Sequence, residues 1–213
     1  NLVAFYPDGA WWIPCVMELN TGLLAIADSL GVGESFCPVR AMLGAFLTEA
    51  HFPIPDLLTC GVGATCDDFS AIAQRLNGLG YPILWWEMPH RRNPEPGEPA
   101  VELPGGSIAP AAQVAFVQGE LERLRAAFEE LAGHTLTDEA LRDGVRQANR
   151  VRAALCELRV LAYAAESCPI PALETLIAEM LAIHFCSDRA ESLAVLEDML
   201  ALARTRVEHQ EGV

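Results

Sequence analysis

Strand-like and helix-like patterns alternate in the first half of this chain and give way to helix-like patterns alone in the second half. Short β-rich runs, LVAFY, PDLLTCGV and YPILWWEMP, are separated by longer segments with helical spacing. Alternation at this interval is typical of βαβ units, whose strands pair in parallel and are covered by helices. We therefore predict an α/β domain over residues 1–105 with a mostly parallel sheet.

The second half contains only helical patterns. The segment AAQVAFVQGELERLRAAFEELAGH has apolar residues at helical spacing and ends near Gly133, and Thr137 is the predicted N-cap of the next helix. Residues 90–110 are dense in proline and glycine, which predicts a loop or arm. We therefore predict that a helical region occupies residues 106–213.

The charge balance limits the partners of this chain. Its 213 residues carry a formal net charge of −15, and a surface of this sign repels phosphate backbones, which argues against nucleic-acid binding. The sequence has no apolar run long enough to span a bilayer, and its N-terminal residues lack the charged and apolar regions of a signal peptide. We predict a cytoplasmic protein that does not enter a membrane.

The chain has seven cysteines, which is many for its length. An odd count without a secretory signal argues against a disulfide scaffold, so core packing and metal binding are the two remaining uses. There is no C-x-x-C pair in the sequence. Any metal site must therefore be assembled from segments that are distant in the sequence.

Two cysteines stand at the predicted starts of helices. Cys37 precedes PVRAMLGAFL, in which Pro38 suits the first helical position, and Cys66 precedes DDFSAIAQRL. Unpaired N–H groups at a helix start stabilise a thiolate, and a parallel sheet would place both cysteines at the same edge. The residues alone leave two interpretations open, small buried apolar side chains or ligands of one metal site, with Cys60 as an alternative to Cys66.

The order of several segments resembles the 2-hydroxyacyl-CoA dehydratase / benzoyl-CoA reductase family. These segments are CPVRAMLG, PDLLTCGVGATCDD, YPILWWEMP and ELERLRAAFEELAGHTLTDEALRDGVRQANRVRAALCELRVLA, and the resemblance extends from about residue 35 to the end. It implies an iron–sulfur enzyme subunit that binds a [4Fe–4S] cluster through three cysteines. It also implies a homologous second subunit, an ATP-hydrolysing iron–sulfur activator that donates a low-potential electron, and radical chemistry on an acyl-CoA thioester, by either dehydration or ring reduction.

The resemblance assigns the first two cluster ligands to Cys37 and Cys66, with Cys60 competing for the second position. In the family the third cysteine belongs to a second α/β domain beyond the helical part. The sequence therefore resembles an N-terminal portion of a longer subunit, or one of two split chains. Three other cysteines are candidates to replace the third ligand: Cys156, Cys168 and Cys186. The alternative interpretation is a non-catalytic scaffold or partner subunit of the same fold that lacks a complete cluster.

Overall fold

The computed structural model forms two compact units, one spanning residues 14–135 and the other residues 136–213 together with residues 1–13. The structure describes residues 2–7, 15, 18–51, 53–183 and 188–213. The first long helix of the second half, Ala111–Ala132, therefore belongs to the same unit as the strands. The domain limits at residues 105 and 106 remain a prediction.

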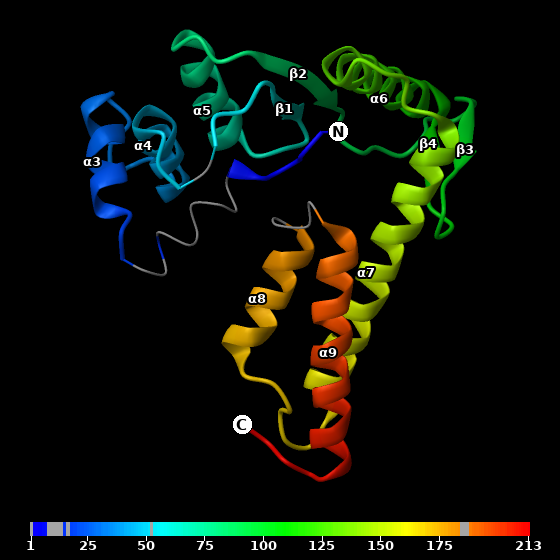
Figure 1. Ribbon diagram of the computed structural model, residues 1–213. Coiled ribbons are helices and arrows are strands. Elements are labelled where there is room, and N and C mark those ends of the chain that lie inside the picture. Colours follow the sequence, from blue (N-terminus) through cyan, green and yellow to red (C-terminus); the bar gives the residue numbers. More distant parts are fainter. Residues whose placement is uncertain (1, 8–14, 16–17, 52, 184–187) are drawn as a thin grey trace. The chain divides into compact units, whose positions relative to one another are not determined.

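A single βαβ unit is at the centre of the first compact unit (Figure 1). Strands β1 (Leu58–Gly63) and β2 (Ile83–Met88) pair in parallel, and helix α5 (Asp67–Gly78) connects them. Gly63 ends β1 with a φ of +89°, and a Cβ atom there would lie 2.3 Å from the carbonyl oxygen of Met88. Only glycine fits this close approach of the two strands. The predicted α/β class with a parallel sheet is confirmed.

Helix α6 (Ala111–Ala132) covers the outer edge of β2 with a pair of charged side chains. The Glu120 carboxylate accepts a hydrogen bond from the backbone N–H of Glu87 at 2.7 Å, and Arg123 donates to the carbonyl of Trp85 at 3.3 Å. The two side chains also bind each other at 2.5 Å. They satisfy backbone groups that would otherwise need a neighbouring strand.

A helical layer precedes the sheet in the chain. Helix α3 (Thr21–Ser29) packs against α4 (Ala41–Thr48), which follows directly on the short 3₁₀ helix η1 (Pro38–Arg40). Gly44 permits the close approach of α4 to α3, because a Cβ atom there would lie 2.5 Å from the Leu23 carbonyl oxygen. The six residues from Ala41 to Phe46 are all buried, so α4 is the core helix of this layer.

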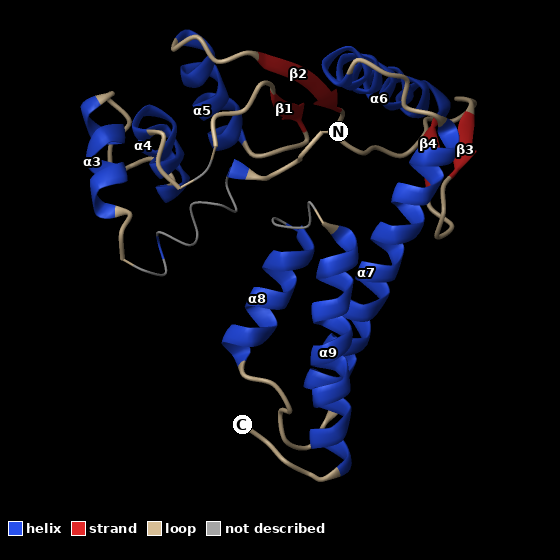
Figure 2. Ribbon diagram, in the orientation of Figure 1, coloured by secondary structure: helices blue, strands red, loops and turns tan. Residues whose placement is uncertain are grey.

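Two segments differ in detail from the sequence-based expectations. Residues 90–110, predicted as a loop or arm, contain an antiparallel hairpin of two short strands, β3 (Ala100–Glu102) and β4 (Ile108–Pro110) (Figure 2). Gly105 and Gly106 both have positive φ angles, which allows the chain to reverse tightly between the two short strands. The run LVAFY at residues 2–6 does not form a strand, because β-propensity depends on tertiary context.

The C-terminal part of the second compact unit, residues 136–213, is mostly helical where the structure describes it, as predicted. Helices α7 (Asp138–Ala164), α8 (Ala172–Ile183) and α9 (Arg189–Glu208) pack on one another. Thr137 is the N-cap of α7, with its side-chain oxygen accepting from the Ala140 N–H at 3.2 Å, which confirms the predicted cap. The buried side chains form one core: Val151, Ala154, Leu155, Leu158, Ile170, Ala178, Leu193, Leu196, Leu200 and Ala203.

We expect Leu196→Ala to destabilise the helical unit by about 2–5 kcal/mol, because the Leu196 side chain is fully buried and its removal leaves a cavity. Leu202→Ala on the same helix is the matched control, since Leu202 is 44% exposed and should cost about 0.5 kcal/mol or less. Urea unfolding followed by circular dichroism measures both values. Equal losses of stability in the two variants would contradict the assigned core.

The hydrogen bonds that Glu120 makes with the Glu87 N–H and with Arg123 predict a loss of stability at acid pH. Arg123 and the Glu87 N–H hold the pKa of Glu120 below its ordinary value of 4.5. A carboxylate with a lowered pKa in the folded state stabilises the fold above pH 4.5, and this contribution is lost as the pH falls through the folded-state pKa. We therefore expect the stability of Glu120→Gln to fall less steeply than that of the wild type below pH 4.5. Glu130→Gln, which replaces an exposed carboxylate on α6, should follow the wild type in the same pH series of thermal melts.

Candidate functional site

Cys37 lies at the start of the helical segment that forms the core of the layer. It is the N-cap of η1, Pro38 occupies the first position of that helix, and η1 continues into α4. The Cys37 carbonyl accepts a hydrogen bond from the Arg40 N–H at 3.0 Å, while the residue itself is exposed. The predicted placement of Cys37 at a helix start is confirmed.

Cys66 lies at the start of α5. A short turn separates it from the carboxyl end of β1. Cys66 is the N-cap of the helix with an extended backbone, and its side chain is exposed. The sulfur caps none of the N–H groups of the first turn, so these remain available to a ligand or to water. Asp67 and Asp68 occupy that turn and already supply negative charge to the positive end of the helix dipole.

Cys60 differs from both in its surroundings. It lies in the middle of β1 opposite Trp85, is 8% exposed, and its thiol lies 3.5 Å from the carbonyl oxygen of Gly61. Burial raises the pKa of the Cys60 thiol, which opposes formation of the thiolate that a metal requires. These properties favour Cys66 over Cys60 as the second candidate ligand.

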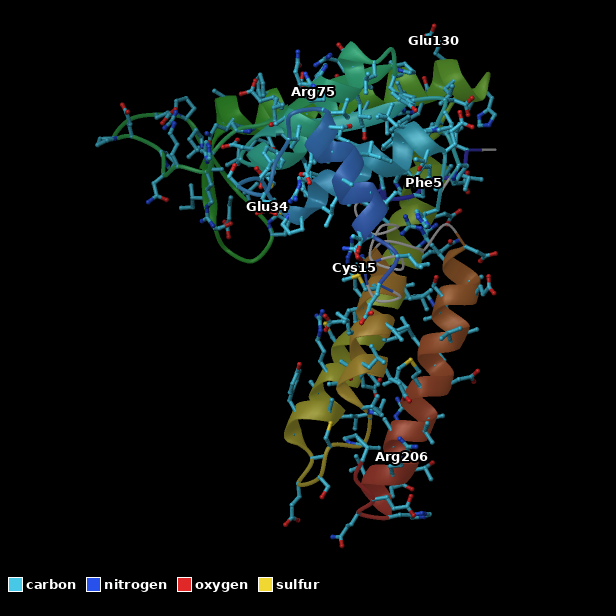
Figure 3. The ribbon with its side chains drawn as sticks, turned by 90° about the vertical axis from the view of Figure 1, so that its left-hand side faces the viewer. Phe5, Cys15, Glu34, Arg75, Glu130 and Arg206 are labelled. Carbon is cyan, nitrogen blue, oxygen red and sulfur yellow. The ribbon has the colours of Figure 1, made fainter. Side chains whose placement is uncertain are left out.

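The segments that carry Cys37 and Cys66 pack together. Helix α5 contacts η1, and the loop before η1 forms with α5 an open, mostly apolar cavity of about 360 Å³. Phe36 lines this cavity next to Cys37, and Ala71 lines it five residues after Cys66, which is about 7.5 Å along a helix axis. Neither cysteine itself lines the cavity. Arg75 of α5, which is labelled in Figure 3, also lines the cavity and donates to the Leu30 carbonyl at 2.7 Å.

The remaining described cysteines have separate surroundings. The half-buried Cys15 lies 3.8 Å from the side-chain nitrogen of Asn20, Cys156 is exposed on α7, and the Cys168 thiol donates to the Ile170 carbonyl at 3.0 Å. Cys186 lies outside the described residues. Among the residues that the structure describes, no three His, Cys, Asp or Glu side chains are grouped closely enough to hold a metal ion.

Two described sulfur donors would fit part of the ligand set of an iron–sulfur cluster. Cys37 and Cys66 supply two accessible sulfur donors of the kind that iron–sulfur clusters use, on two elements that contact each other. One residue of this region was not anticipated from the sequence, the buried Arg40 three positions after Cys37. Its only sequence signal is a basic residue within the apolar run PVRAMLGAFL.

The difference in burial predicts the order in which the thiols react. We expect iodoacetamide to modify Cys37 and Cys66 in the native protein at least about tenfold faster than Cys60, because only thiolates react and Cys60 is buried with a raised pKa. Peptide mass spectrometry over a time course measures each rate, with urea-unfolded protein as the control in which the three rates converge. Rapid native modification of Cys60 would contradict its place in the core.

The chain is similar in sequence to a known protein family. Within the described ranges, no helix is both long enough and apolar enough to cross a membrane. No curated protein matches the chain. The family described as 2-hydroxyglutaryl-CoA dehydratase, D-component, matches residues 9–213, which is nearly the whole chain. The match confirms the resemblance of the cysteine-bearing segments, and the chain belongs to the 2-hydroxyglutaryl-CoA dehydratase D-component family.

Proposed function

We propose that the chain holds a [4Fe–4S] cluster through Cys37 and Cys66 as part of a 2-hydroxyacyl-CoA dehydratase or a related acyl-CoA reductase. Membership of the family makes it a component of a dehydratase. The observation that carries the proposal is the pair of exposed thiols at the starts of two helical segments that pack together. Both groups are accessible, and neither is committed to the protein core.

The protein's own groups would perform three tasks at this site. The Cys37 and Cys66 thiolates would bind iron, and the uncapped N–H groups at the start of α5 would stabilise the negative charge on sulfur. The contact between η1 and α5 would hold the two sulfur atoms in a fixed relation. When bound, the cluster would supply a single low-potential electron to the acyl-CoA thioester.

The remaining parts of the enzyme belong to the same proposal. The third ligand, a homologous second subunit, an ATP-hydrolysing iron–sulfur activator and the acyl-CoA substrate would come from outside the described residues, in the cytoplasm. An exposed apolar row on α8 supports a partner surface, since Leu173, Leu176 and Ile177 are 57%, 37% and 56% exposed at helical spacing.

A second candidate function is that of a scaffold subunit without a complete cluster. The observation that favours it is that the described part of the chain contains no group of three potential metal ligands. The two functions differ in one property, since a scaffold purified without oxygen would contain no stoichiometric iron or sulfide. Iron analysis therefore separates them.

We expect Cys37→Ser and Cys66→Ser to lose most of the bound iron and acid-labile sulfide after anaerobic purification, because each removes a thiolate ligand. Cys156→Ser is the matched control, since it removes another exposed thiol, on α7, and it should leave both contents unchanged. Iron and sulfide assays together with the visible absorption spectrum measure the result. Full iron content in both ligand variants would refute the assignment.

A further inference from the structure

Arg40 is the only buried cation in the described ranges. It is 5% exposed, is the last residue of η1 and is the N-cap of the apolar helix α4, whose first six residues are all buried. Placing a guanidinium in such surroundings costs free energy unless its five N–H donors find acceptors. The position is therefore an expensive one for arginine, and its contacts show what the side chain does there.

The guanidinium joins three segments around Cys37. Nη1 donates to the carbonyl oxygen of Phe36 at 3.2 Å, Nη2 lies 3.4 Å from a carboxylate oxygen of Asp28 in α3, and Nε is buried without a hydrogen-bond partner among the described residues. The backbone of Arg40 adds a further contact, since its N–H donates to the Cys37 carbonyl. Arg40 thus binds the residue before Cys37 through its side chain and Cys37 itself through its backbone.

Two other contacts also hold the same loop. The Phe36 N–H donates to the Gly33 carbonyl at 3.0 Å, and exposed Arg75 of α5 holds the Leu30 carbonyl at the beginning of the loop. Only the Arg40 contact combines burial with an ion pair, and hydrogen bonds of charged groups strengthen when water is excluded. Arg40 therefore binds the backbone carbonyls of both Phe36 and Cys37.

We propose that Arg40 is a positioning residue that presets the backbone around Cys37 for cluster binding. This inference rests on the proposed cluster role of Cys37. The planar guanidinium of Arg40 is a fork of N–H donors that pairs with Asp28 and binds the Phe36 carbonyl. These contacts order the loop before the cluster binds. The proposed role involves no direct contact of Arg40 with the cluster or the substrate. Arg40 acts through the conformation of residues 36 and 37.

The test compares Arg40→Gln, which removes the charge and the fork, with Arg75→Gln, which removes a loop contact made by an exposed arginine. We expect Arg40→Gln to raise amide hydrogen exchange at Phe36 and Arg40 by roughly tenfold or more, the change expected when a charged hydrogen bond is lost. It should also speed the loss of iron to a chelator and alter the electron paramagnetic resonance spectrum of the reduced protein. Arg75→Gln should leave all three readouts near wild type.

A second variant covers the case in which Arg40→Gln does not fold. Asp28→Asn removes the charge partner at a side chain that is 47% exposed, and it should shift the same readouts in the same direction by a smaller amount. Arg40→Lys keeps the charge without the fork and should restore the readouts only in part.

The outcomes separate the two claims. Wild-type protein that takes up no iron overturns the proposed function. Wild-type protein that binds iron, with Arg40→Gln or Asp28→Asn retaining iron as long as wild type, overturns the positioning role alone. Faster exchange spread evenly over residues 14–135 would also overturn it, because it would mark a general stabilising role.

Discussion

The parallel pairing of β1 with β2 is the constraint on which the candidate site depends. Parallel neighbours cannot be joined by a tight turn, so the chain must cross over, and it does so through α5. The crossover begins at the carboxyl end of β1, which is where Cys66 stands. The same helix then packs against η1, the element that Cys37 begins, so the topology of one βαβ unit brings the two cysteine-bearing segments together.

In the first unit, the polar groups that support the fold are buried, whereas the two candidate ligands are exposed. Glu120 and Arg40 are buried charges that bind backbone groups of β2 and of the loop before η1, and both act as internal supports. Cys60 is buried in the strand itself. Cys37 and Cys66 are exposed, so the two candidate ligands are the groups of this set that remain accessible to a cluster.

Local sequence signals predicted those parts of the structure that depend on neighbouring residues. Pro38 after Cys37 and the capping oxygen of Thr137 marked helix starts correctly. Tertiary pairing was not predictable in the same way. The run LVAFY has strand propensity but forms no strand, whereas the hairpin near Gly105 lies in a segment that composition predicted to be a loop or arm. The burial of Arg40 depends on Asp28, twelve residues away, and no local pattern indicates that contact.

Anomalous diffraction at the iron edge is the most direct test of the central claim that Cys37 and Cys66 share one cluster. Crystals of the protein grown without oxygen, after reconstitution with iron and sulfide, should show a single compact group of iron peaks. We expect the sulfur atoms of Cys37 and Cys66 both to lie within bonding distance of iron in that group. Iron bound at Cys60, or a cluster bonded to neither Cys37 nor Cys66, would contradict it.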